Sequence, residues 1–111
     1  MSRYSSLERF RTPADLLRYE IIQEQASALG RLGRAVEAAL ARLRDFDAAR
    51  ALSASATDRQ MRRTLVLEAG HALWMFVVQR EASGLLDSRT VMRDYKVPGE
   101  VVNCMGAFPT G

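Results

Sequence analysis

The stretch YEIIQEQASALGRLGRAVEAALARL (residues 19–43) decides the fold of this 111-residue chain. Its apolar line recurs at alternating steps of three and four, at Tyr19, Ile22, Ala26, Leu29, Gly33, Val36, Leu40 and Leu43. Steps of this kind keep side chains in one line along an α-helix and form a heptad seam. A second apolar line widens the same face, at Ile21, Leu32, Ala39 and Phe46. The pattern predicts a long helix that packs against more than one neighbouring helix.

This helix is predicted to run from residue 13 to residue 50. Thr12 is a good N-terminal capping residue, and Pro13 suits the first helical position. Gly30 and Gly33 would each cost about 1 kcal/mol relative to alanine inside a helix, so a break at this point is one interpretation. We favour an unbroken helix because the seam keeps its phase across both glycines. Gly33 then lies in the seam and would admit a bulky side chain from a partner helix.

A second helix is predicted over residues 57–83, after a short loop. Thr57 and Gln60 have the spacing of a capping box, and Gly84 is a natural helix stop. This helix contains HALWMFVVQRE (residues 71–81), the densest apolar stretch of the chain. Its apolar segment would span roughly 22 Å, less than the roughly 30 Å core of a bilayer, so we predict no membrane span.

The second helix is apolar on nearly all sides, and a single antiparallel partner helix cannot cover it. Residues 87–106 are predicted to form two short helices, the second opening at Pro98, and these would cover part of it. A second copy of the chain would cover the rest. The predicted core or oligomer-interface residues are Leu29, Gly33, Val36, Leu40, Leu67, Trp74 and Val78.

The predicted fold is therefore all-α, with one domain over residues 1–111 that begins with a flexible arm over residues 1–11. A long antiparallel helical hairpin carries two short C-terminal helices and dimerises into a four-helix bundle. The length fits a single domain, and a composition of 48% hydrophobic and 26% charged residues is typical of a globular protein.

Charge and cysteine content limit the class of partner and the compartment. The net charge is +3, and acidic residues alternate with basic ones along the chain, so no nucleic-acid-binding stripe is predicted. The single cysteine, Cys104, fits a reducing compartment. The polar N-terminus has no apolar leader segment, and we therefore expect a cytoplasmic protein.

The stretch EAGH (residues 68–71) is the sharpest candidate for chemistry. Ferritin-like di-iron sites use Glu-x-x-His on two helices and one further glutamate from each of two others. If the hairpin turns near Ser53, residues 68–72 lie opposite about residues 36–40, which brings Glu37 close. Two chains could then offer Glu37, Glu68 and His71 twice over to iron or manganese. The alternative is structural: Glu37 pairs with Arg34, and Glu68 holds a partly buried His71.

Other chemistry is less well supported, and we expect no cofactor outside that metal alternative. The two short C-terminal helices resemble a helix-turn-helix in outline, but the second offers Glu100 and Asn103 to DNA and no arginine or lysine. Arg59, Arg62 and Arg63 could touch phosphates, although charges at a helix start are usually a solvated face. Cys104 has no nearby histidine or acid with the spacing of a catalytic thiol.

Four segments together resemble a family of small uncharacterised bacterial helical proteins, classed as a domain of unknown function. They are DLLRYEII, ALGRLGRAVEAAL, FVVQREASGL and DYKVPGEVVNCMGA, and the resemblance covers residues 15–107. The resemblance implies no activity, cofactor or functional residue. The leading hypothesis is therefore a non-enzymatic cytoplasmic protein that acts through homo-oligomerisation or a protein partner, with the metal protein and a DNA-binding regulator as alternatives.

Overall fold

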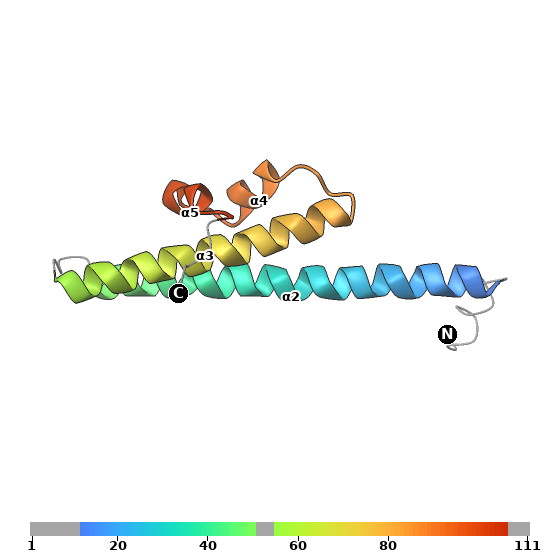
Figure 1. Cartoon of the computed structure of the whole chain (residues 1–111), viewed down its shortest axis with the longest axis horizontal. Helices are drawn as coiled ribbons and strands as arrows, with labels where there is room; N and C mark the ends of the chain where they lie inside the picture. Colours follow the sequence, from blue (N-terminus) through green and yellow to red (C-terminus); the bar gives the residue numbers. More distant parts are fainter. Residues whose placement is uncertain (1–11, 51–54, 107–111) are drawn as a thin grey trace.

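The computed structural model describes residues 12–50 and 55–106 of the chain. These residues form four α-helices and no strand, as the sequence predicts. The helices are α2 (Pro13–Ala49), α3 (Ala56–Ala82), α4 (Arg89–Asp94) and α5 (Gly99–Asn103). Figure 1 shows α2 and α3 as a long antiparallel hairpin with α4 and α5 stacked beside α3. The predicted flexible arm, residues 1–11, lies outside the described residues.

The start and the continuity of α2 are as predicted. The Thr12 hydroxyl accepts a hydrogen bond from the backbone N–H of Asp15 at 3.2 Å, which satisfies one of the free donors of the first turn. The helix then runs unbroken through Gly30 and Gly33 to Ala49. The seam pattern therefore outweighs the helix-breaking tendency of two glycines.

Gly33 is buried because two aromatic rings occupy the space that a side chain would take. A Cβ on this residue would lie 3.1 Å from the Tyr95 hydroxyl and 3.5 Å from the Phe76 ring. The two rings meet edge to face, with centroids 5.8 Å apart, a geometry that aromatic pairs favour. The prediction that Gly33 admits a bulky side chain is confirmed, and Tyr95 adds a second one from the C-terminal segment.

The C-terminal end of α3 lies where the sequence predicts it. The residue that caps its N-terminus differs from the predicted one. Ser55, and not Thr57, caps the helix: its hydroxyl accepts from the backbone N–H of Asp58 at 3.0 Å. At the other end Gly84 adopts φ +88°, and the backbone N–H of Leu85 donates to the carbonyl of Arg80 at 2.8 Å. This is the Schellman arrangement that glycine permits after a helix.

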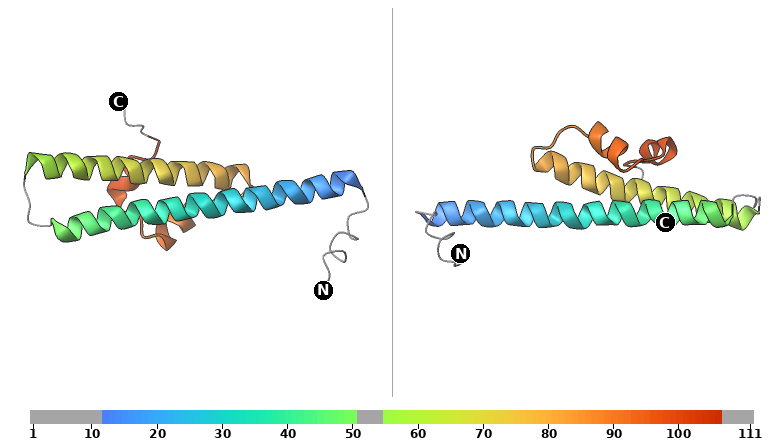
Figure 2. Two further views of the ribbon diagram at one scale, coloured as in Figure 1. Left: turned by 90° about the horizontal axis from the view of Figure 1, so that it is seen from below. Right: turned by 180° about the vertical axis from the view of Figure 1, so that it is seen from behind.

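The core lies between α2 and α3 and continues under the two short helices. Its buried side chains are Val36, Ala39, Leu40, Leu43, Val66, Ala69, Leu73, Phe76, Val77, Val91 and Val101. Val91 comes from α4 and Val101 from α5, so both short helices contribute to one core. Figure 2 shows α4 and α5 on one face of the hairpin, with the opposite face uncovered.

The predicted core or interface residues divide into three groups. Gly33, Val36 and Leu40 are buried. Leu29, Leu67 and Trp74 are half-buried, and Val78 is 40% exposed. Trp74 is partly covered by the end of α5, where a Cβ on Gly106 would lie 3.4 Å from the indole ring. The short helices therefore cover only one flank of α3, and a role for Val78 in an oligomer interface stays a prediction.

The register of the hairpin follows from two contacts near its ends. Gly33 lies against Phe76, and Asp47 bonds to Arg62, so each step forward along α2 corresponds to one step back along α3. Residues 36–40 consequently lie level with residues 69–73, within one residue of the prediction. On the same count Ala82, the last residue of α3, lies level with Ser27.

At Gly70 the backbone of α3 lies close to the C-terminal end of α5. A Cβ on Gly70 would lie 3.0 Å from the backbone oxygen of Cys104 and 3.1 Å from its Cβ. Backbone atoms cannot move aside as a flexible side chain can. A residue larger than glycine therefore has to displace the end of α5.

We expect Gly70→Ala to lower the free energy of unfolding by about 1–3 kcal/mol, the usual cost of overpacking. Gly30→Ala is the matched control, because its Cβ would meet only its own helix's Arg34 guanidinium, at 3.3 Å. That substitution should stabilise the protein by up to about 1 kcal/mol through helix propensity. Urea unfolding followed by circular dichroism measures both. Equal effects of the two substitutions would contradict the close approach at Gly70.

Candidate functional site

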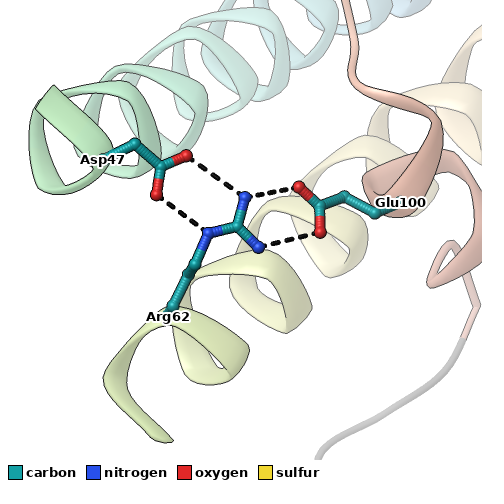
Figure 3. A network of polar contacts seen from close by, with 3 residues as sticks. All are labelled: Asp47, Arg62 and Glu100. Atoms are coloured by element: carbon teal, nitrogen blue, oxygen red, sulfur yellow. Dashed lines mark hydrogen bonds and ion pairs between the residues drawn. The ribbon is translucent and has the colours of Figure 1, made fainter. Parts of the chain in front are cut away.

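One network of charged side chains joins three helices (Figure 3). Arg62 of α3 lies between Asp47 of α2 and Glu100 of α5. Its Nε donates to Asp47 Oδ1 at 2.8 Å and its Nη2 to Asp47 Oδ2 at 3.1 Å. Its Nη1 donates to Glu100 Oε2 at 2.8 Å and its Nη2 to Glu100 Oε1 at 2.5 Å. A guanidinium can bind two carboxylates in this way because its donors form a planar fork.

The network changes the protonation behaviour of its members. The hydrogen bonds from Arg62 lower the pKa of Glu100, against a smaller opposing effect of partial burial. The hydrogen bonds to Glu100 and then to Asp47 raise the pKa of Arg62 beyond its usual range, so the guanidinium stays charged. One positive charge between two negative ones holds α2, α3 and α5 together at the loop end of the hairpin.

An open pocket of about 420 Å³ lies next to this network. It is lined by Arg59, Arg62, Arg63, Val66, Leu67, Glu100 and Cys104. Arg62 is already bound by two carboxylates, and Arg63 Nη2 donates to Gln60 Oε1 at 2.6 Å. The arginine cluster is therefore occupied with contacts inside the chain, which favours a structural joint over a phosphate site.

The three residues of the hypothetical metal site are all exposed. Glu68 and His71 lie on α3 and Glu37 lies on α2. Across residues 12–50 and 55–106, no group of three histidine, cysteine, aspartate or glutamate side chains could hold a metal ion within one chain. A site that needs two chains stays a prediction.

The expectation of a partly buried His71 is wrong. His71 lies two residues before Leu73, which is fully buried, and a spacing of two residues places side chains on nearly opposite sides of a helix. It therefore faces away from the core, on the side of α3 that the short helices leave open.

The exposed large apolar side chains are concentrated in the N-terminal part of α2. α2 has 37 residues and α3 has 27, so α2 continues past the end of its partner (Figure 1). We call residues 13–26, which have no α3 beside them, the α2 arm. Five large apolar side chains of the arm are exposed: Leu16, Leu17, Tyr19, Ile21 and Ile22. The described residues expose ten large apolar side chains in all, and half of these lie in the arm. The arm makes up only about a seventh of the described residues. The arm is therefore the best candidate for a binding surface.

None of the described helices is long and apolar enough to cross a membrane, which agrees with the prediction from the sequence.

Neither the Arg62 network nor the uncovered α2 arm was predicted from the sequence. The Arg62 network joins residues 15 and 38 positions apart, and finding it requires knowing which of three neighbouring arginines faces α2. The predicted register contained part of that signal, because it places residue 62 level with about residue 46, one residue from Asp47. The arm was predicted as part of the seam, but the difference in length between the two predicted helices was not used.

The comparisons with known proteins agree with the resemblance seen in the sequence. A model of a family of unknown function (DUF6665) matches residues 7–111, so the chain belongs to this family. The family's description names no activity. Among curated proteins and solved structures, none matches the chain.

Removing the central arginine should loosen the joint between the helices. We expect Arg62→Met to lower the free energy of unfolding by about 1 kcal/mol, since exposed ion pairs contribute up to about that much each. The effect is limited because the three side chains are 37–46% exposed and water screens them. Arg93→Met is the control: Arg93 pairs only with its neighbour Asp94, at 3.4 Å, and joins no two helices. An equal loss in both variants in urea unfolding would contradict a role for the network.

The network also predicts a dependence on pH. The pKa of Glu100 is lower in the folded chain than its ordinary value of 4.5, so its stabilisation is fully present above that value and is lost as pH falls through the folded pKa. We expect the end of α5 to loosen in acid, with a change in the fluorescence of Trp74, which Gly106 covers. Glu100→Gln should remove this part of the acid response. An unchanged acid transition in that variant would assign the response to other carboxylates.

Proposed function

We propose that this DUF6665 member is a non-catalytic protein that acts by associating with protein chains, and that it associates with itself. It forms no covalent intermediate and needs no cofactor in this role. The helical hairpin serves as a rigid support that presents an apolar helix surface to a partner.

The exposed apolar side chains of the α2 arm are the observation that carries this proposal. Ile22 is 61% exposed and Leu17 is 56% exposed, on a helix whose remaining length is covered by α3. The exposed side chains lie on more than one side of the helix, with Tyr19 and Ile22 in the seam, and a concentration of exposed apolar side chains in one segment usually marks an interaction surface. Removal of these side chains from water by a partner would be favourable at about 25 cal/mol per Å².

The positions of the charged residues support a structural role over a catalytic one. Arg62 and Glu100 have shifted pKa values because they bond to each other across two helices. Such shifts also occur at active sites, but here each one is explained by an ion pair that joins elements of the fold. The half-buried, unpaired thiol of Cys104 supports a reducing compartment such as the cytoplasm.

Self-association should appear in the mass of the protein in solution. We expect sedimentation equilibrium to give an average mass that rises with concentration from 12.4 kDa toward twice that value. Weak association is reversible, so dilution should restore the monomer.

The fluorescent dye ANS provides the complementary measurement, because it binds exposed apolar surface. Its fluorescence per chain should fall as the dimer forms and covers the arm. A constant mass of 12.4 kDa at all concentrations would rule out self-association as the mode of action.

A further inference from the structure

The α2 arm carries the same seam as the part of α2 that α3 covers. Tyr19, Ile22 and Ala26 continue the heptad spacing of Leu29, Gly33 and Val36 without a change of phase. The covered part of this seam packs against a helix, and the residues beyond it have the same spacing. The surface that best fits the arm is therefore another helix, placed where α3 would continue if it were longer.

The exposed isoleucines strengthen this conclusion. Ile21 is 49% exposed and Ile22 is 61% exposed, well inside a helix. β-branched residues are weaker helix formers than alanine or leucine, because the helix restricts their χ1 rotation. Two adjacent isoleucines therefore disfavour this part of the helix in isolation, and packing against a partner would offset that cost.

A second copy of the chain has the right shape for this place. Beyond Ala82 the hairpin is one helix thick, and the element that protrudes there is one helix, the arm itself (Figure 1). Two copies related by a two-fold axis can place their arms side by side and antiparallel. Each arm then occupies the space beyond the end of the other copy's α3. Two-fold dimers are the commonest symmetric assemblies because one surface serves both partners.

The helix lengths select one of the registers that the seam allows for this pairing. In an antiparallel pair the two seam positions face each other in alternation, and one such register places Tyr19 of one copy opposite Ile22 of the other. In that register Pro13 lies level with Ala28 of the other copy. The last residue of α3, Ala82, lies level with Ser27, one residue away, so each arm fills the available length and stops where α3 of the other copy ends.

The charges of the arm also suit a second copy better than a highly charged partner. Arg18 Nη1 lies 3.9 Å from Asp15 Oδ1, and Arg31 Nη2 lies 3.4 Å from Glu24 Oε1, so most of the charge is balanced within the chain. The residues beside the seam in the arm include Gln23 and Gln25, which are neutral, and Arg18, whose charge is paired with that of Asp15. Two identical arms can therefore approach without bringing like charges together along the seam.

We infer that two copies of the chain dimerise through their α2 arms, antiparallel, with the two-fold axis near residues 20 and 21. This inference rests on the proposed self-association and names the surface that performs it. An arm of 14 residues is about 21 Å long and presents on the order of 300 Å² of one face. Stable complexes bury roughly 800 Å² on each partner, so this dimer is reversible.

A pair of arm variants tests the surface. Ile22→Glu places a charge in the seam, and we expect it to raise the dimer dissociation constant at least about tenfold in sedimentation equilibrium. Ser27→Glu adds the same charge about 140° around the same helix, outside the seam, and should leave the constant within about twofold. Residue 22 has no α3 beside it, so circular dichroism should show the same helical content in both variants.

A distance measurement tests the register. Arg34→Cys in a Cys104→Ser background gives one exposed site for a spin label on each copy. The antiparallel pairing places the two labels about 40 Å apart along the helix axis. A parallel pairing would place them level, separated by little more than the 8–10 Å between packed helices.

The outcomes separate this inference from the proposed function. If the wild-type chain dimerises and Ile22→Glu dimerises equally well, or the labels lie close together, the arm pairing is wrong and self-association through another surface stands. If the wild-type chain stays a monomer at every concentration, the proposed self-association and the arm pairing both fail. Loss of the dimer in Ile22→Glu alone, together with a label distance near 40 Å, supports the pairing.

Discussion

The packing of α2 against α3 in one register is the constraint on which the other features depend. Gly33 admits Phe76 and Tyr95 into the seam, and these rings would not fit if either helix were shifted by a residue. The same register brings Asp47 level with Arg62. It also fixes where α3 ends beside α2, and therefore which residues of α2 remain uncovered. The core, the ion-pair network and the arm are three consequences of one alignment.

The short helices are held by two interactions of unequal strength. Close packing of Gly70 against Cys104, with Val101 fully buried, fixes the position of α5 through contacts that exclude water. The bonds between Arg62 and Glu100 are well aligned but partly solvated, and ion pairs of this kind contribute at most about 1 kcal/mol each. Packing therefore determines that α5 docks, while the ion pair affects how firmly it does so and how that changes with pH.

Most of the fold could be predicted because its signals are local. The heptad seam, the cap at Thr12 and the stop at Gly84 each act within a few residues. The choice between Ser55 and Thr57 as the cap does not follow from residue type, because both serine and threonine can accept the same hydrogen bond at a helix start. The exposure of His71 and Val78 could not be predicted from the local sequence either, because it depends on which side of α3 the distant α4 and α5 cover. The Arg62 network required the register as well as the charges.

The lengths of the two long helices contain more information than their patterns alone. A hairpin with equal helices can bury its seam within one chain, whereas a difference of ten residues leaves part of the seam of α2 with no α3 beside it. An uncovered segment that only extended the helix would be expected to carry polar residues of high helix propensity, such as glutamate, lysine or glutamine. The arm instead carries Tyr19 and Ile22 on an apolar line in phase with the core, and Ile21 on the second apolar line of the same helix. Its seam is that of a buried surface at a place where the described residues of one chain supply no second helix, and a second arm would supply that helix.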